Sequence, residues 1–179
     1  MRAPVLAAAC AVAAACAGAA PADRVPPPPG GTVTARWTGA DSGRVVAAGE
    51  MRWCGALRRA DLFASAGDTA IGVALFLVDS LRADSFGVVK PDSLPGDTTR
   101  PSARAALRVA KPNVVDQYKG FDGLLVLEEA GPREARGRLQ AALGAATQGG
   151  PVRLEATFRV PLRRLDADSC PPSASRPPL

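Results

Sequence analysis

Residues 152–163 read VRLEATFRVPLR, and apolar and polar residues alternate through the whole stretch. The apolar set occupies every second position: Val152, Leu154, Ala156, Phe158, Val160 and Leu162. Successive side chains of a β-strand point to opposite faces, so this period places all of them on one face. The stretch therefore predicts a long strand with one face on a core and the other in water, as antiparallel sheets allow.

Similar patterns, separated by turn residues, recur along the chain. They predict strands over residues 32–38, 44–57, 60–66, 69–78, 84–90, 102–110, 114–118 and 121–129. Gly67-Asp68 favours a tight hairpin, and apolar residues on both faces of 69–78 predict a central strand buried on both sides. In 121–129 we expect Phe121 to point inward in phase with Leu125 and Leu127. The fold class predicted is all-β: a single antiparallel β-sandwich or β-barrel domain of about 8–10 strands.

Residues 132–143 fit either a strand or a helix. A strand places alternate residues inward: Ala135, Gly137, Leu139, Ala141 and Leu143. A helix would begin at Pro132 and end at Gly144. Because Gly137 in the middle would cost a helix about 1 kcal/mol, and because a hairpin with 152–163 fits across 144–151, we predict a strand.

The first nineteen residues have the layout of a secretory signal peptide. Met1-Arg2 precedes an uncharged run, residues 3–20, which is too short and too rich in alanine to make a good membrane-spanning helix. Ala17-Gly18-Ala19 fits an ordinary cleavage site. Alternatively, Ala13-Ala14-Ala15-Cys16 resembles the lipobox of bacterial lipoproteins, although Ala13 stands where leucine is commonest. That resemblance implies that Cys16 is lipidated and becomes the new N-terminus.

The composition divides the chain into four parts: signal peptide 1–19, Pro/Gly-rich linker 20–31, β domain 32–170 and Pro-rich tail 171–179. Four consecutive prolines, residues 26–29, favour an extended polyproline spacer. We therefore expect a domain held away from a membrane by a tether.

Cys54 and Cys170 are the cysteines that remain after either form of processing. An even pair in an exported protein is typical of a disulfide, so we predict a bond between them.

The sequence offers little for catalysis. It contains no histidine, which removes the commonest general base and zinc ligand, and it lacks the phosphate-loop, nucleophile-elbow, dinucleotide and C-x-x-C motifs. Glu128-Glu129 should point apart on a strand, and Asp166 with Asp168 lacks the further ligands of a calcium loop. We expect no catalytic residue, no cofactor and no metal site, although a hydrolase whose two carboxylates meet in a cleft is a third possibility.

Charge does not indicate nucleic-acid binding. The net charge of +5 is dispersed, and aromatic residues make up 4% of the chain. The outward faces of 132–143 and 152–163 should hold Arg136, Arg138, Arg153 and Arg159 beside Glu134 and Glu155. These residues fit either an anion or lipid-headgroup surface or cross-strand charge pairing, and we predict pairing.

These observations predict a non-enzymatic cell-envelope protein, exported across the inner membrane and anchored through Cys16, or otherwise periplasmic or secreted. The domain would act as a structural or binding module with an unknown protein or small-molecule partner. The alternative is a carrier of a small apolar ligand, held in a barrel cavity that small inward residues leave open.

Overall fold

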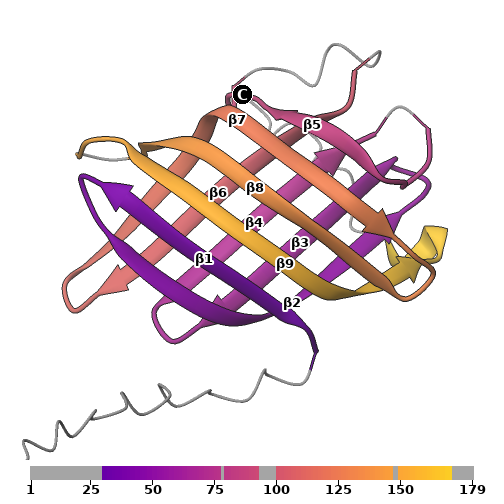
Figure 1. Ribbon diagram of the computed structural model, residues 1–179, viewed down its shortest axis with the longest axis horizontal. Coiled ribbons are helices and arrows are strands. Elements are labelled where there is room, and N and C mark those ends of the chain that lie inside the picture. Colours follow the sequence, from indigo (N-terminus) through magenta and orange to yellow (C-terminus); the bar gives the residue numbers. More distant parts are fainter. Residues whose placement is uncertain (1–29, 78, 93–99, 147–148, 171–179) are drawn as a thin grey trace, which may run out of the picture.

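A computed structural model describes residues 30–77, 79–92, 100–146 and 149–170 as a single closed β-barrel (Figure 1). The strands are β1 (Thr32–Gly39), β2 (Gly43–Cys54), β3 (Arg59–Ala66), β4 (Thr69–Phe76), β5 (Asp84–Val88), β6 (Ser102–Lys111), β7 (Val114–Ala130), β8 (Glu134–Ala145) and β9 (Val152–Leu165). One short 3-10 helix, η1 (Ala167–Ser169), follows β9. Within these ranges the chain forms no helix with the length and apolar character needed to cross a bilayer. The expected signal peptide, most of the linker and the Pro-rich tail lie outside the described residues.

The strands follow one another around the barrel in the order β1-β2-β3-β4-β6-β5-β7-β8-β9. The barrel closes where β1 pairs antiparallel with β9, from Thr32 opposite Arg159 to Gly39 opposite Val152. Most neighbours are antiparallel, while β5–β6 and part of β2–β9 pair in parallel. Closure leaves no exposed sheet edge. The all-β prediction is confirmed, and of its two architectures the structure is the barrel.

The strand β1 enters the barrel at a fork between β2 and β9. Along its length, β1 pairs with β2 on one side and with β9 on the other. Before β1 begins at Thr32, β2 and β9 pair directly with each other, with Met51 opposite Leu162. Gly31 lies at this fork with a φ of 102°, and a Cβ there would come within 2.6 Å of the Cα of Val160. Glycine is therefore required where the chain enters.

The two ends of the barrel differ (Figure 1). The turns β1–β2, β3–β4, β6–β7 and β8–β9 lie at one end, which we call the hairpin end. The β3–β4 turn is the tight hairpin predicted from Gly67-Asp68, with Ala66 opposite Thr69. The other end, which we call the disulfide end, holds the start of β1, the turns β2–β3 and β7–β8, and η1.

The inward side chains form one continuous apolar cluster. Within residues 152–163 the burial alternates as predicted, with Leu154 fully buried and Arg153 exposed. The uncertain stretch 132–143 is a strand, and all five of its predicted inward residues are buried. The hairpin between β8 and β9 also forms, with Leu143 opposite Val152.

Aromatic rings fill space that glycines leave inside the barrel. A Cβ at Gly43 would overlap the ring of Trp37, and one at Gly137 would lie 2.6 Å from Cζ of Phe158. Both rings are at least nine-tenths buried. Each glycine therefore accommodates a ring from the neighbouring strand, and the barrel wall and interior pack closely at both places.

Three predictions about strand faces are wrong. Residues 114–118 and 121–129 belong to one strand, β7, whose pairing with β8 shifts between Gly120 and Asp122. This β-bulge changes the phase of the strand, so Phe121 points outward and is 41% exposed. A second shift, between Leu127 and Glu129, leaves Glu128 and Glu129 both exposed instead of on opposite faces.

The third correction concerns β4, which is buried on its inner face only. Ile71, Val73 and Leu75 point inward, whereas Gly72 and Phe76 on the other face are half-buried. The outer face of a barrel strand meets solvent, which the apolar composition of this segment did not reveal. The guanidinium groups of two arginines, Arg59 and Arg104, cover the Phe76 ring at 5.8 and 5.4 Å from its centroid.

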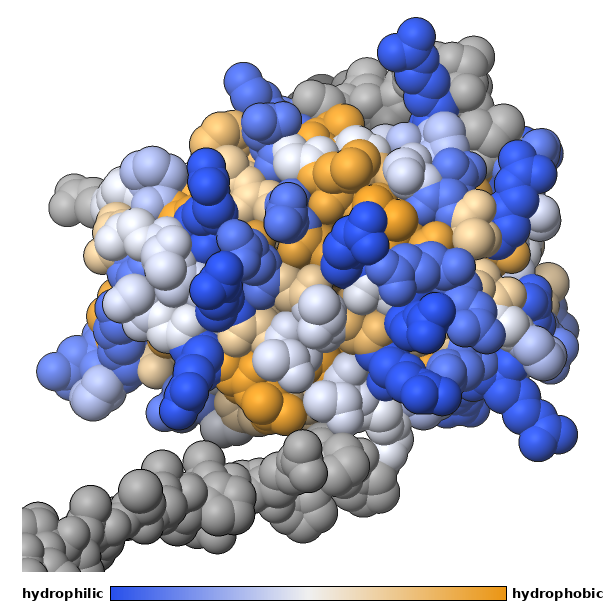
Figure 2. Space-filling model, viewed as in Figure 1, coloured by the Kyte–Doolittle hydropathy of each residue, from blue (hydrophilic) through white to orange (hydrophobic). Residues whose placement is uncertain are grey.

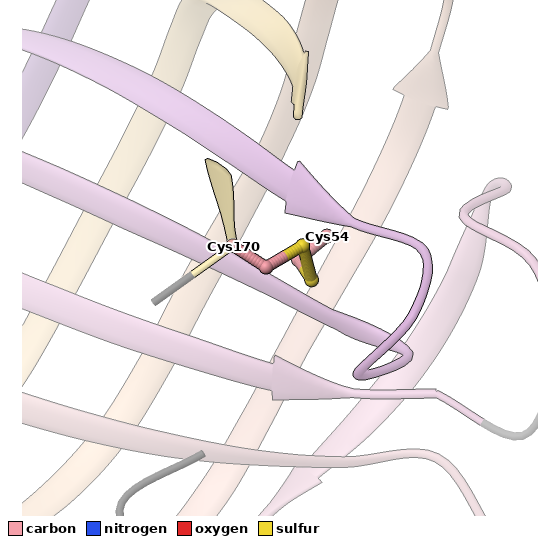
Figure 3. The surroundings of a disulfide bond; sticks show 2 residues. All are labelled: Cys54 and Cys170. Carbon is pink, nitrogen blue, oxygen red and sulfur yellow. A yellow bond between two sulfur atoms is a disulfide. The ribbon is translucent and has the colours of Figure 1, made fainter. Parts of the chain in front are cut away.

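The predicted disulfide joins Cys54, the last residue of β2, to Cys170 after η1 (Figure 3). Their Cα atoms are 5.6 Å apart, within the usual range for a disulfide, and they are 116 residues apart in sequence. Cys54 is 3% exposed. The bond therefore fastens the chain that follows β9 to the wall of the barrel at the disulfide end.

Candidate functional site

Threonines on the outer face of β1 and β9 form the floor of a groove. The strand period directs Thr34 and Thr157 outward, and the two residues lie opposite each other in the β1–β9 ladder. Threonine is short, and longer side chains stand nearby on the outer face, with Arg138 opposite Thr157 and the exposed Val46 opposite Thr34, so the surface is hollowed between them. Two adjoining hollows of about 360 and 350 Å³ share Thr34, Arg138 and Thr157. We call them together the threonine groove.

Arginines dominate the rim of the threonine groove. Five arginines and two glutamates line it, which gives a formal charge of +3 (five minus two): Arg36, Arg44, Arg136, Arg138 and Arg159, with Glu128 and Glu155. Figure 2 shows this side of the molecule, where blue hydrophilic side chains stand on either side of white, tan and orange residues. The groove therefore presents a positively charged rim around a hydroxyl-bearing floor.

Ion pairs connect most of these arginines to neighbouring strands, as the sequence predicted. Nη2 of Arg36 lies 2.5 Å from Oε2 of Glu155, and Nε of Arg159 donates to Oε1 of Glu134 at 2.9 Å. The hydrogen bond to Glu134 raises the pKa of Arg159 further above its ordinary value, so this guanidinium stays charged.

On β8, Arg138 hydrogen-bonds to Glu128, and Arg136 lies 3.5 Å from Glu128 and 3.9 Å from Glu129. The bulge in β7 therefore lets both glutamates meet one arginine. The predicted pairing is confirmed for Arg136, Arg138 and Arg159, whereas Arg153 makes no ion pair with a described residue.

Two cross-strand pairs on the rim carry like charges. Arg36 lies opposite Arg44 in the β1–β2 ladder, and Arg136 lies opposite Arg159 in the β8–β9 ladder. Arg44 makes no ion pair with any described residue. Directly opposed like charges destabilise a sheet, so charge pairing explains the rim only in part.

A second polar cluster lies at the hairpin end. Nζ of Lys111 lies 2.7 Å from Asp116 and 3.4 Å from Asp41, which belongs to the β1–β2 turn. The hydrogen bond to Asp116 is the main cause that raises the pKa of Lys111 above its ordinary 10.5. Since β6 and the β1–β2 turn come from opposite sides of the strand order, Lys111 links two sides of the barrel mouth.

Tyr118 lies within the influence of this cluster and is 5% exposed. Burial raises its pKa above the ordinary 10.0, and the charge of Asp116 adds to the effect. Trp37 is also buried, and its Nε1 makes no hydrogen bond with the described residues. The alternation along single strands does not reveal this cluster, because Asp41 is far in sequence from Lys111, Asp116 and Tyr118.

The carboxylates that follow β9 do not line the threonine groove. Asp166 and Asp168 are exposed around η1, and the described ranges contain no group of three or more histidine, cysteine or acidic residues that could hold a metal ion. Cys16, the predicted lipidation site, lies outside the described residues.

No protein-family model, curated protein or solved structure matches this chain.

Proposed function

We propose that this chain is an exported, non-enzymatic cell-envelope protein, anchored through a lipid on Cys16, whose barrel serves as a structural or binding module. The observation that carries the proposal is the disulfide between Cys54 and Cys170. Disulfides form and persist in oxidising compartments outside the cytosol, which agrees with a leader of the secretory type. Ordinary cleavage after Ala19 would instead give a periplasmic or secreted form.

A binding role is supported by the outer surface. The threonine groove combines a net positive rim with hydroxyl groups, and its glutamates are engaged by arginines. Carboxylates held in this way are poor candidates for the acid and base of a hydrolase, which supports a non-enzymatic role.

The carrier function is the weaker alternative. A carrier needs an interior cavity, but Trp37 and Phe158 pack against Gly43 and Gly137. The two hollows that form the groove lie on the outer face of the wall. Close packing of inward rings at both places argues against an open lumen.

Intact-mass analysis of the chain extracted from its native membrane tests the proposal. We expect the mass of a chain that begins at Cys16 and carries a diacylglycerol group. This mass should also be lower by two hydrogens than that of the reduced chain, because of the disulfide. Cys16→Ser should abolish the lipid mass. A wild-type chain that begins at Ala20 without lipid would refute the anchor, and a fully reduced chain would remove the main support for export.

A further inference from the structure

Two cross-strand pairs on the rim of the threonine groove place arginines directly opposite each other, and neighbouring glutamates offset part of the repulsion at Arg36, Arg136 and Arg159. Arg36 faces Arg44, and Arg136 faces Arg159, one pair on either side of Thr34 and Thr157. Arg159 lies opposite Thr32, and the four steps from Thr32 to Arg36 offset the two pairs by about 13 Å along the strand direction at 3.3 Å per step. Positions that oppose local stability are expected where a protein binds something. An anion lying between the two arginines of a pair would relieve the part of their repulsion that the glutamates leave.

The side chains of the groove suit phosphate. A guanidinium presents a planar fork of N–H donors that matches phosphate oxygens, and the threonine hydroxyls can donate further hydrogen bonds. The aromatic residue that borders the groove, Phe158, is 3% exposed and offers no surface on which a base could stack. A peptide strand would find no free edge here, because β1 and β9 are paired on both sides.

The chain enters the barrel at the border of this groove. Thr32, the first residue of β1, lines the second hollow. If Cys16 carries a lipid, residues 17–29 can span at most about 45 Å between the anchor and Gly30. Phosphate headgroups of the anchoring leaflet are therefore within reach of the groove and are present there at high effective concentration.

We propose that the threonine groove and its arginines bind phosphate headgroups of the membrane to which the chain is tethered. The barrel then lies with β1, β8 and β9 against an anionic lipid surface instead of standing away from it on its linker. The inference rests on the proposed function, because lipid on Cys16 places the groove beside headgroups. To that function it adds what the groove binds and which face of the barrel lies on the membrane.

The test uses the full-length chain with Cys16→Ser, so that attraction through the protein surface is measured without the lipid. Sedimentation with phosphatidylcholine vesicles is compared with sedimentation with vesicles that also contain phosphatidylglycerol. We expect a clear preference for the anionic vesicles, and salt should weaken it. Arg44→Gln combined with Arg138→Gln should reduce the partition coefficient of the chain onto the anionic vesicles by about fivefold per arginine.

The matched control is Arg108→Gln combined with Lys119→Gln. These exposed residues on β6 and β7 give the same change in net charge, and β6 lies on the opposite side of the barrel from β1. This control should bind anionic vesicles nearly as the parent chain does. An equal loss in both double variants would show a general charge effect and would overturn the inference.

A second probe identifies the source of the phosphate. Titration of the same chain with inorganic tripolyphosphate should give weak binding compared with anionic vesicles. Tight binding of tripolyphosphate without binding to vesicles would overturn the lipid assignment in favour of a soluble anion. The anchor is measured separately by mass, so an unmodified Cys16 with selective vesicle binding would refute the proposed function and leave the headgroup site standing.

Discussion

Glycines at inward positions make room for the aromatic rings of this barrel. Gly43 lies under the ring of Trp37, and Gly137 lies under that of Phe158 with the carbonyl oxygen of Val126 close by. The alternation of residues 132–143 predicts Gly137 on the inner face but does not show why a glycine is needed there, because the ring that fills the space comes from the neighbouring strand.

Because Gly137 is closely packed, adding one methyl group there should destabilise the fold. Gly137→Ala should lower the free energy of unfolding by about 1–3 kcal/mol, since the new Cβ would overlap both Phe158 and the Val126 backbone. Gly72→Ala is the control, because nothing lies within 4 Å of a Cβ there and the residue faces outward. It should be neutral or stabilise by up to about 1 kcal/mol. Urea denaturation measures both, and equal effects would contradict the packing described.

The pKa values of Tyr118 and Lys111 predict how the free energy of unfolding changes at alkaline pH. Both have pKa values raised above the ordinary 10.0 and 10.5, Tyr118 mainly by burial and Lys111 mainly by its hydrogen bond to Asp116. Each keeps its proton longer in the folded state, so its contribution is complete below the unfolded pKa and is lost as pH rises through the folded one.

The free energy of unfolding should therefore fall as pH rises above about 10, and Tyr118→Phe should make this fall shallower. Urea titrations at several pH values for the two proteins provide the measurement. An identical slope in both would show that Tyr118 is not protected in the fold.

At the scale of elements, the strands with strict alternation were predictable. The sequence placed every inward residue of β8 and β9 correctly, because each step along them reverses the face. It failed in β7, where bulges after Gly120 and Leu127 change the phase and move Phe121 and Glu129 to unexpected sides. Bulges depend on the pairing with β8, which the period of one strand does not contain.

The disulfide was predictable from the count of cysteines, and its effect is testable. Cys170→Ser should lower the free energy of unfolding by about 2–5 kcal/mol, because the bond closes a long loop between the end of β2 and the end of the described chain. Urea denaturation of the wild type with and without reductant should reproduce this loss. A variant as stable as the oxidised wild type would contradict a structural role for the bond.

At the scale of the whole molecule, closure was the feature that the sequence left open. An all-β chain of this length fits a sandwich or a barrel, and the choice depends on the pairing of β1 with β9, more than a hundred residues away. The threonine groove follows from that closure, because Thr34 and Thr157 come from those two strands. For the same reason Thr34 and Arg138 could not be recognised beforehand as parts of one site.

Nuclear magnetic resonance tests closure most directly. Cross-strand nuclear Overhauser effects between β1 and β9 around Thr34 and Thr157, with slow amide exchange in both strands, are the predicted result. A sheet in which β1 and β9 show no mutual contacts and exchange their amides rapidly would contradict the closed barrel.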